Sequence, residues 1–190
     1  MKYLKYFLGI IGLLILLFIG MGFIIPSISY SSEITVDKPV KEAWAVMNDE
    51  SKINEWLKGI TNIEHVSGEK GTVGAVTKYT FTENGEESIV LETIKSIRHG
   101  ESITMDFEVE GVMVMNYKVD FTEKDEKTYV KSSTTTQGEG MFMRSIVSFM
   151  KGAMKSQEDE NMGNLKTLIE KNKTNYFPET LGETVGKGKE

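Results

Sequence analysis

The chain has 190 residues, 39% of them hydrophobic, and carries 22 Lys and Arg against 28 Asp and Glu, for a formal net charge of −6. This length suits one domain with appendages, and an acidic chain without a basic run repels phosphate backbones, which argues against nucleic-acid binding. With no Cys and two His, the chain excludes disulfides and thiolate ligands and disfavours a His-rich metal site, so we expect no metal and no cofactor.

The chain opens with a long apolar stretch. Residues 6–25 (YFLGIIGLLILLFIGMGFII) contain no charged residue. At about 1.5 Å per residue, a helix of this length spans the hydrocarbon core of a bilayer. We therefore predict a transmembrane anchor within residues 1–26, ended by Pro26. A buried core helix is an alternative for this stretch.

Charges on either side of the span set its orientation. Lys2 and Lys5 precede it, and Glu33 and Asp37 follow it. The positive-inside rule then predicts a single-pass protein with a cytoplasmic N-terminus and an extracytoplasmic soluble domain. The alternative is a secreted protein, because the triplet at 27–29 (SIS) resembles a small-x-small site for signal cleavage.

Two polar segments flank the expected domain at 33–171. Residues 27–32 (SISYSS) are predicted to form a short stalk. Residues 172–190 combine Pro178, three glycines and several charges without periodicity, so we expect a disordered tail. The triplet 172–174 is a glycosylation sequon, which matters only in a eukaryotic secretory pathway.

The domain begins with a short strand over 33–37 and two short helices. Pro39 suits the first position of the first helix. Its apolar residues recur at i, i+3, i+4 and i+7: Val40, Ala43, Trp44 and Met47. A second helix, capped by Asp49 or Ser51, carries Ile53, Trp56 and Leu57.

About six strands follow in quick succession. Alternation of apolar and polar residues predicts strands over 73–81 and 103–109, and Asn84-Gly85 predicts a tight hairpin turn. A three-residue loop over 110–112 pairs Val109 with Met113 and keeps the apolar residues of both strands on one face. A two-residue loop would mix the faces, because one residue of slip turns every side chain over. The last strand is expected over 128–137.

A long helix, from residue 141 to about 171, closes the domain. Four residues in its first half share one apolar face: Phe142, Ile146, Phe149 and Ala153. The polar run 156–161 (SQEDEN) interrupts this stripe. Consecutive hairpins followed by one long helix predict an α+β domain. In it a curved antiparallel sheet wraps around the C-terminal helix, and space between them is the candidate site.

These elements resemble the SRPBCC superfamily of START and polyketide-cyclase-like helix-grip domains. Residues 34–56 (ITVDKPVKEAWAVMNDESKINEW) are similar to its opening, with a strand, a Pro, a helix with a Trp, an Asp-bearing turn and a second Trp. Gly68, Gly71 and Gly74 resemble its glycine-rich turn, and residues 160–171 (ENMGNLKTLIEK) resemble its final helix. The resemblance implies a cavity that binds hydrophobic small molecules or lipids. Some members are cyclases or dehydratases, and others act on protein partners.

Several side chains are candidates for chemistry. Trp44 and Trp56 can line a ligand site or close the core. Tyr79, Tyr117 and Tyr129 can orient a polar ligand group, or bond to backbone. His65 and His99 are expected near turns in solvent. Asp106, Glu108 and Glu110 alternate on the polar face of a strand, which is the expected solvent side. We therefore predict no catalytic residue.

The sequence favours a membrane-anchored binding domain over an enzyme. We expect a hydrophobic or lipid-like ligand in the space between sheet and helix. The predicted ligand-binding residues are Met105, Phe107, Met115, Tyr117, Phe142, Ile146, Phe149 and Met150. The alternatives are an enzyme of polyketide cyclase or dehydratase type, which needs a buried acid or base, and a protein-interaction module without a cavity. The sequence does not indicate an oligomeric state.

Overall fold

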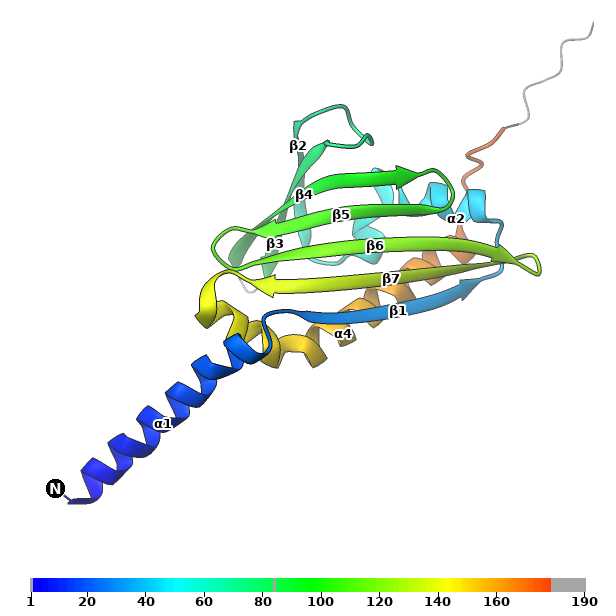
Figure 1. Ribbon diagram of the computed structural model, residues 1–190. Helices are drawn as coiled ribbons and strands as arrows, with labels where there is room; N and C mark the ends of the chain where they lie inside the picture. Colours follow the sequence, from blue (N-terminus) through cyan, green and yellow to red (C-terminus); the bar gives the residue numbers. More distant parts are fainter. Residues whose placement is uncertain (1, 84, 179–190) are drawn as a thin grey trace, which may run out of the picture.

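A computed structural model describes residues 2–83 and 85–178, and it has the predicted α+β helix-grip architecture (Figure 1). Seven antiparallel strands form one curved sheet in the order β1-β7-β6-β5-β4-β3-β2, and the long helix α4 lies along it. The elements are α1 (Lys2–Ile24), β1 (Ile28–Val36), α2 (Val40–Met47), the 3-10 turn η1 (Glu50–Lys52), α3 (Ile53–Trp56), β2 (Ile60–Ser67), β3 (Val76–Glu83), β4 (Glu86–Arg98), β5 (Ser102–Val109), β6 (Met113–Lys124), β7 (Lys127–Gly138) and α4 (Gly140–Lys171).

The register predicted for the β5–β6 hairpin is confirmed. Val109 pairs with Met113, and Met105 pairs with Tyr117, across a three-residue loop. Gly111 in that loop has a φ of +70°, which only glycine adopts without strain. In the preceding hairpin, Asn84 lies outside the described residues, whereas Gly85 has the positive φ expected of its turn. The apolar residues of β5 and β6 consequently share the face that looks toward α4.

Helix α4 is buried near its two ends and less so between them. Ser145 and Val147 are buried near its start, and Met162, Leu165 and Ile169 are fully buried toward its end. The C-terminal group belongs to the main core, together with Val46 of α2 and Val130 of β7. Between the two groups the helix does not bury a side chain completely. The sheet therefore holds α4 at both ends.

The stalk predicted at 27–32 is for the most part a strand. β1 begins at Ile28 and pairs with β7 along its whole length, from Ile28 opposite Thr136 to Val36 opposite Thr128. Ile28 and Ser32 are buried. These residues resemble a polar linker because serines dominate them, yet an edge of β7 is available for their backbone groups. The apolar helix α1 thus leads almost directly into the sheet.

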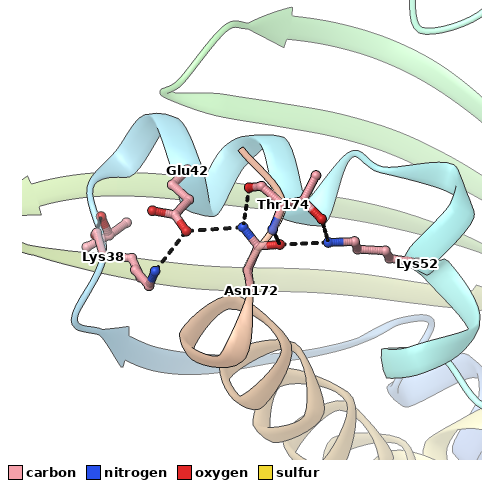
Figure 2. A network of polar contacts seen from close by, with 6 residues as sticks. Lys38, Glu42, Lys52, Asn172 and Thr174 are labelled. Carbon is pink, nitrogen blue, oxygen red and sulfur yellow. Dashed lines mark hydrogen bonds and ion pairs between the residues drawn. The ribbon is translucent and has the colours of Figure 1, made fainter. Parts of the chain in front are cut away.

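The segment after α4 is also more ordered than predicted. Figure 2 shows Asn172 between two elements: its side-chain oxygen accepts from Lys52 at 2.7 Å, and its amide donates to Glu42 at 3.1 Å. The Tyr176 hydroxyl donates to Asp49 at 2.7 Å. Residues 172–178 therefore fasten the end of α4 to α2 and η1. The rest of the predicted disordered tail, 179–190, lies outside the described residues.

Two glycines offer a matched test of how closely α4 approaches the sheet. A Cβ on Gly138, at the end of β7, would overlap the backbone of Met143 and Arg144, whereas a Cβ on Gly152 in α4 would meet nothing within 4 Å. We expect Gly138→Ala to lower the free energy of unfolding by about 1–3 kcal/mol. Gly152→Ala should raise it by about 0.5–1 kcal/mol, because alanine favours the helix. Thermal unfolding of both variants checks this, and equal effects would contradict the close approach.

Candidate functional site

A cavity of about 440 Å³ lies between the sheet, the middle of α4 and the short helices near the N-terminus of the domain. Strands β3 to β6 supply most of one wall, and α4 supplies another with Met154, Gln157, Glu158 and Asn161. The short helices add Ile53, Trp56 and Leu57. The cavity therefore occupies the stretch of α4 that the sheet does not bury.

The predicted ligand-binding residues divide into two groups of four. Met105, Phe107, Met115 and Tyr117 line the cavity, as the register of β5 and β6 requires. Phe142, Ile146, Phe149 and Met150 do not line it. Whether the first group binds a ligand stays a prediction.

Two of the four helix residues, Phe142 and Phe149, contact α1. Phe18 of α1 stacks on Phe149 at 5.6 Å between ring centroids and meets Phe142 edge-on at 5.9 Å. Gly22 permits the approach, because its amide donates to the Ser145 hydroxyl and a Cβ there would lie 2.7 Å from that oxygen. The expected inward apolar face of α4 is thus the face of a helix–helix contact. Periodicity finds an apolar face but does not tell which partner covers it.

Methionine and aromatic side chains make most of the lining adaptable and apolar. The methionines of the lining are Met47, Met105, Met113, Met115 and Met154, from four elements. Trp56 lines the cavity, which is the first of the two roles expected for the tryptophans. Trp44 packs on Phe121 and His99, which is the second role, closing the core. Met side chains rearrange easily, which suits a site that must fit a flexible ligand.

The first of two half-buried tyrosine–carboxylate pairs lies on the sheet wall. The Tyr79 hydroxyl of β3 donates to Glu92 Oε2 of β4 at 3.3 Å. Burial, with a smaller contribution from the charge of Glu50, raises the pKa of Glu92 to about 7, although the bond from Tyr79 opposes the rise. A carboxyl group with such a pKa exchanges protons near neutral pH.

The second pair joins the sheet to the helix wall. The Tyr117 hydroxyl of β6 donates to Glu158 Oε1 of α4 at 3.0 Å. Burial raises the pKa of Glu158, and burial together with the Glu158 charge raises the pKa of Tyr117 well above its usual value. Tyr30 of β1 also lines this region, and burial raises its pKa. The cavity therefore has an apolar body with two polar positions.

Sequence reasoning missed both glutamates, although each left a signal. Glu92 is in phase with Val90 and Ile94 on β4, and all three line the cavity, so a carboxylate occupies an apolar face. Glu158 falls inside the polar run 156–161, which interrupts the stripe of α4. The polarity of that run was the signal, because it marks the part of α4 that buries few side chains and so lies beside the cavity. A polar residue in phase with apolar neighbours is the pattern to look for.

Apart from two tyrosines, the other candidates lie outside the cavity. His65 bonds to the Gly68 carbonyl, at 2.9 Å, and His99 packs against Trp44. Tyr79 and Tyr117 line the cavity, and Tyr129 does not. Asp106 accepts from Asn116 at an exposed position. Among the described residues, no group of three or more His, Asp and Glu side chains is arranged to hold a metal ion.

A mouth is marked by cavity-lining residues that are also exposed. Glu50 of η1 and Lys70 of the β2–β3 turn form an ion pair, at 3.3 Å, and both side chains are more than half exposed. Gly71 and Asn48 flank them. An exposed pair of this kind contributes little stability, so it can open without a large cost.

Comparison with known proteins agrees with this geometry. The family model described as polyketide cyclase/dehydrase and lipid transport matches residues 27–170. No curated protein sequence matches the chain.

Solved structures share the fold at low sequence identity. Ara h 8.0201 is 20% identical with a TM-score of 0.58, covering 74% of this chain and 99% of its own. A protein of Thermus thermophilus is 12% identical with a TM-score of 0.61, covering 75% of this chain and 97% of its own. The di-domain ARO/CYC protein BexL of the BE-7585A biosynthetic pathway is 14% identical with a TM-score of 0.59, covering 77% of this chain and 51% of its own.

Replacing Glu92 by the neutral Gln tests its burial. The folded-state pKa lies above the unfolded value, so the folded state binds more protons between about pH 4.5 and 7 and loses stability as pH rises through that window. At pH 8 we expect Glu92→Gln to raise the free energy of unfolding by about 1–2 kcal/mol. At pH 5 the difference should nearly vanish. Thermal unfolding at both pH values measures it, and an effect independent of pH would contradict the buried charge.

Proposed function

Because the chain belongs to the polyketide cyclase/dehydrase and lipid transport family, we propose that it binds a hydrophobic or amphipathic small molecule between the sheet and α4. The cavity of about 440 Å³ is the single observation that carries this proposal. Burying about 300 Å² of apolar ligand at roughly 25 cal/mol per Å² contributes on the order of 7 kcal/mol before association costs. By itself this contribution corresponds to a Kd of about 10 μM, and the association costs weaken it further.

Cavity and surface substitutions of methionine test this function. Met115 lines the cavity, whereas Met150 is exposed on α4. We expect Met115→Trp to fill part of the space and to reduce at least about tenfold the ligand captured from a total lipid extract. Met150→Trp is the control and should capture as much as the wild type. Mass spectrometry of the released ligand measures both, and capture of nothing by the wild-type protein would contradict the proposal.

A second function, acid–base catalysis of cyclase or dehydratase type, is favoured by one observation. Glu92 faces the cavity with a pKa of about 7 and accepts a bond from Tyr79. A group poised in this way can give or take a proton at neutral pH. The same mass spectrometry separates binding from dehydration, because a binding protein returns the captured molecule unchanged and a dehydratase returns one that has lost water. A cyclisation that keeps its water leaves the mass unchanged and is detected by a changed chromatographic retention time.

The third possibility is an interaction module without a cavity. It requires a filled core, whereas this domain contains a cavity. Exposed apolar residues on α4 would favour it, and Phe142 and Phe149 are such residues. Both, however, contact Phe18 of α1. Because the two phenylalanines lie beside the proposed anchor, a membrane surface is favoured over a protein partner as the surface that they contact.

We also propose that α1 is a membrane anchor. Within the described part of the chain, Tyr3–Ile24 is the one helix long and apolar enough to cross a bilayer, and 6% of its most apolar window is buried. Cleavage at 27–29 would cut into β1, where Ile28 is buried and Ser29 bonds to Thr135 at 3.0 Å. Retention of α1 therefore preserves the sheet edge. The anchor would hold the cavity near a bilayer, where hydrophobic ligands concentrate.

The proposed topology is testable because the chain has no cysteine of its own. Single cysteines replace Glu110 in the exposed β5–β6 turn and Tyr3 near the N-terminus. With the domain on the extracytoplasmic side, a membrane-impermeant maleimide should label Glu110→Cys in intact cells. Tyr3→Cys should react only after the membrane is opened. The reverse labelling pattern would contradict the proposed orientation. Recovery from the medium of a Glu110→Cys protein that lacks α1 would indicate that the anchor is cleaved.

A further inference from the structure

The polar side of the cavity is acidic. Three of its described lining residues are glutamates, Glu50, Glu92 and Glu158, and one, Lys70, is basic. Lys70 lies at the mouth and is already paired with Glu50. Neither Glu92 nor Glu158 forms an ion pair with a described residue, although each accepts a tyrosine hydroxyl. Two carboxylates thus face the same apolar space without a cation.

The surroundings of the two carboxylates differ. Near Glu158 on α4, Lys155 favours the charged form of Glu158, and Asp159 disfavours it more strongly. Around Glu92 the neighbours are Tyr79 of β3, Glu50 of η1 and, on its own strand, Val90 and Ile94. Glu50 repels the Glu92 charge, and Tyr79 supplies a single neutral bond. Of these two half-buried carboxylates, Glu158 therefore has one cation nearby, whereas no cation in the described part of the chain acts on Glu92.

A buried carboxylate without a cation is costly, and a ligand that brings one offsets the cost. We propose that the cavity selects amphipathic ligands that carry a protonated amine, which pairs with Glu92 while the apolar part of the ligand packs on the methionines. This inference rests on the proposed function and specifies its ligand class. A carboxylate ligand would instead add a third negative charge beside Glu92 and Glu158, and an alcohol would gain only a neutral hydrogen bond.

Binding of an amine to Glu92 should depend on pH. The charged groups near Glu92 are Glu50 and its partner Lys70, and the titratable phenol is Tyr79. Because burial raises the pKa of Glu92 to about 7, the empty site is increasingly protonated below neutral pH and must release a proton to bind a cation. Affinity for an amine therefore falls from pH 8 to pH 5.5, and affinity for an alcohol does not.

Three probes with the same chain length separate the ligand classes: decylamine, decanol and decanoate. The full-length protein is held in phosphatidylcholine nanodiscs, and bound probe is measured by native mass spectrometry against empty nanodiscs. Glu92→Gln is compared with Glu108→Gln, which changes the charge equally at an exposed position outside the cavity. The uptake of each probe by empty nanodiscs is subtracted, so its partition into lipid does not enter the affinities, and these can be compared between probes as well as between proteins.

We expect the wild-type protein to bind decylamine at least about tenfold more tightly than decanol, and decanoate most weakly. Glu92→Gln should abolish the preference for the amine, and Glu108→Gln should keep it. Equal binding of amine and alcohol by the wild type would overturn the cationic ligand but leave the proposed function intact. A preference lost in Glu158→Gln and kept in Glu92→Gln would overturn the assignment to Glu92. Failure to bind any probe, together with failure to capture lipid from the extract, would overturn both proposals.

Discussion

The structure depends on how the sheet holds α4. The helix is fixed at its start, where Gly138 lets β7 run against its backbone, and at its end, where Met162, Leu165 and Ile169 are fully buried. The middle of the helix buries no side chain completely and meets the sheet through hydrogen bonds such as that from Tyr117 to Glu158, and the cavity lies beside it. An empty space in a protein interior forfeits packing energy, so it persists only if the frame around it is stiff. Two fixed ends on one rigid helix provide that frame.

Segments outside the sheet reinforce the same frame. The segment 172–178 ties the end of α4 to α2 and η1 through Asn172, and α1 packs on the first turns of α4 through Phe18 and Gly22 (Figures 1 and 2). Through these contacts the proposed anchor α1 packs on α4, and the end of α4 is bonded to the short elements beside the mouth. A ligand that entered between Glu50 and Lys70 would meet Glu92 on the sheet wall, and Glu158 on the helix wall. The polar positions of the cavity thus belong to the elements that frame it.

Much of this architecture could be predicted from the sequence, because local chemistry determines it. Alternation and a glycine loop determined the register of β5 and β6, and a helical stripe located α4 to within a residue at its start. The errors arose where a partner far along the chain decides the outcome. The serine-rich residues 28–32 belong to a strand because β7 offers an edge for their backbone groups. Phe142 and Phe149 pack on α1, a partner that the periodicity of α4 does not reveal. Glu92 could have been found from its phase with Val90 and Ile94, but its pKa depends on burial that only the fold creates.

The central claim is a persistent hollow between the sheet and the middle of α4, and the methionine methyl groups report on it directly. Xenon enters apolar cavities and shifts the resonances of the atoms that line them. In ¹³C-methyl-methionine spectra under xenon, our account predicts saturable shifts for Met105, Met115 and Met154, which line the cavity, and none for Met162, which is fully buried in the core and does not line it. Absence of shifts at the three lining methionines would show that side chains fill the space and would contradict the account.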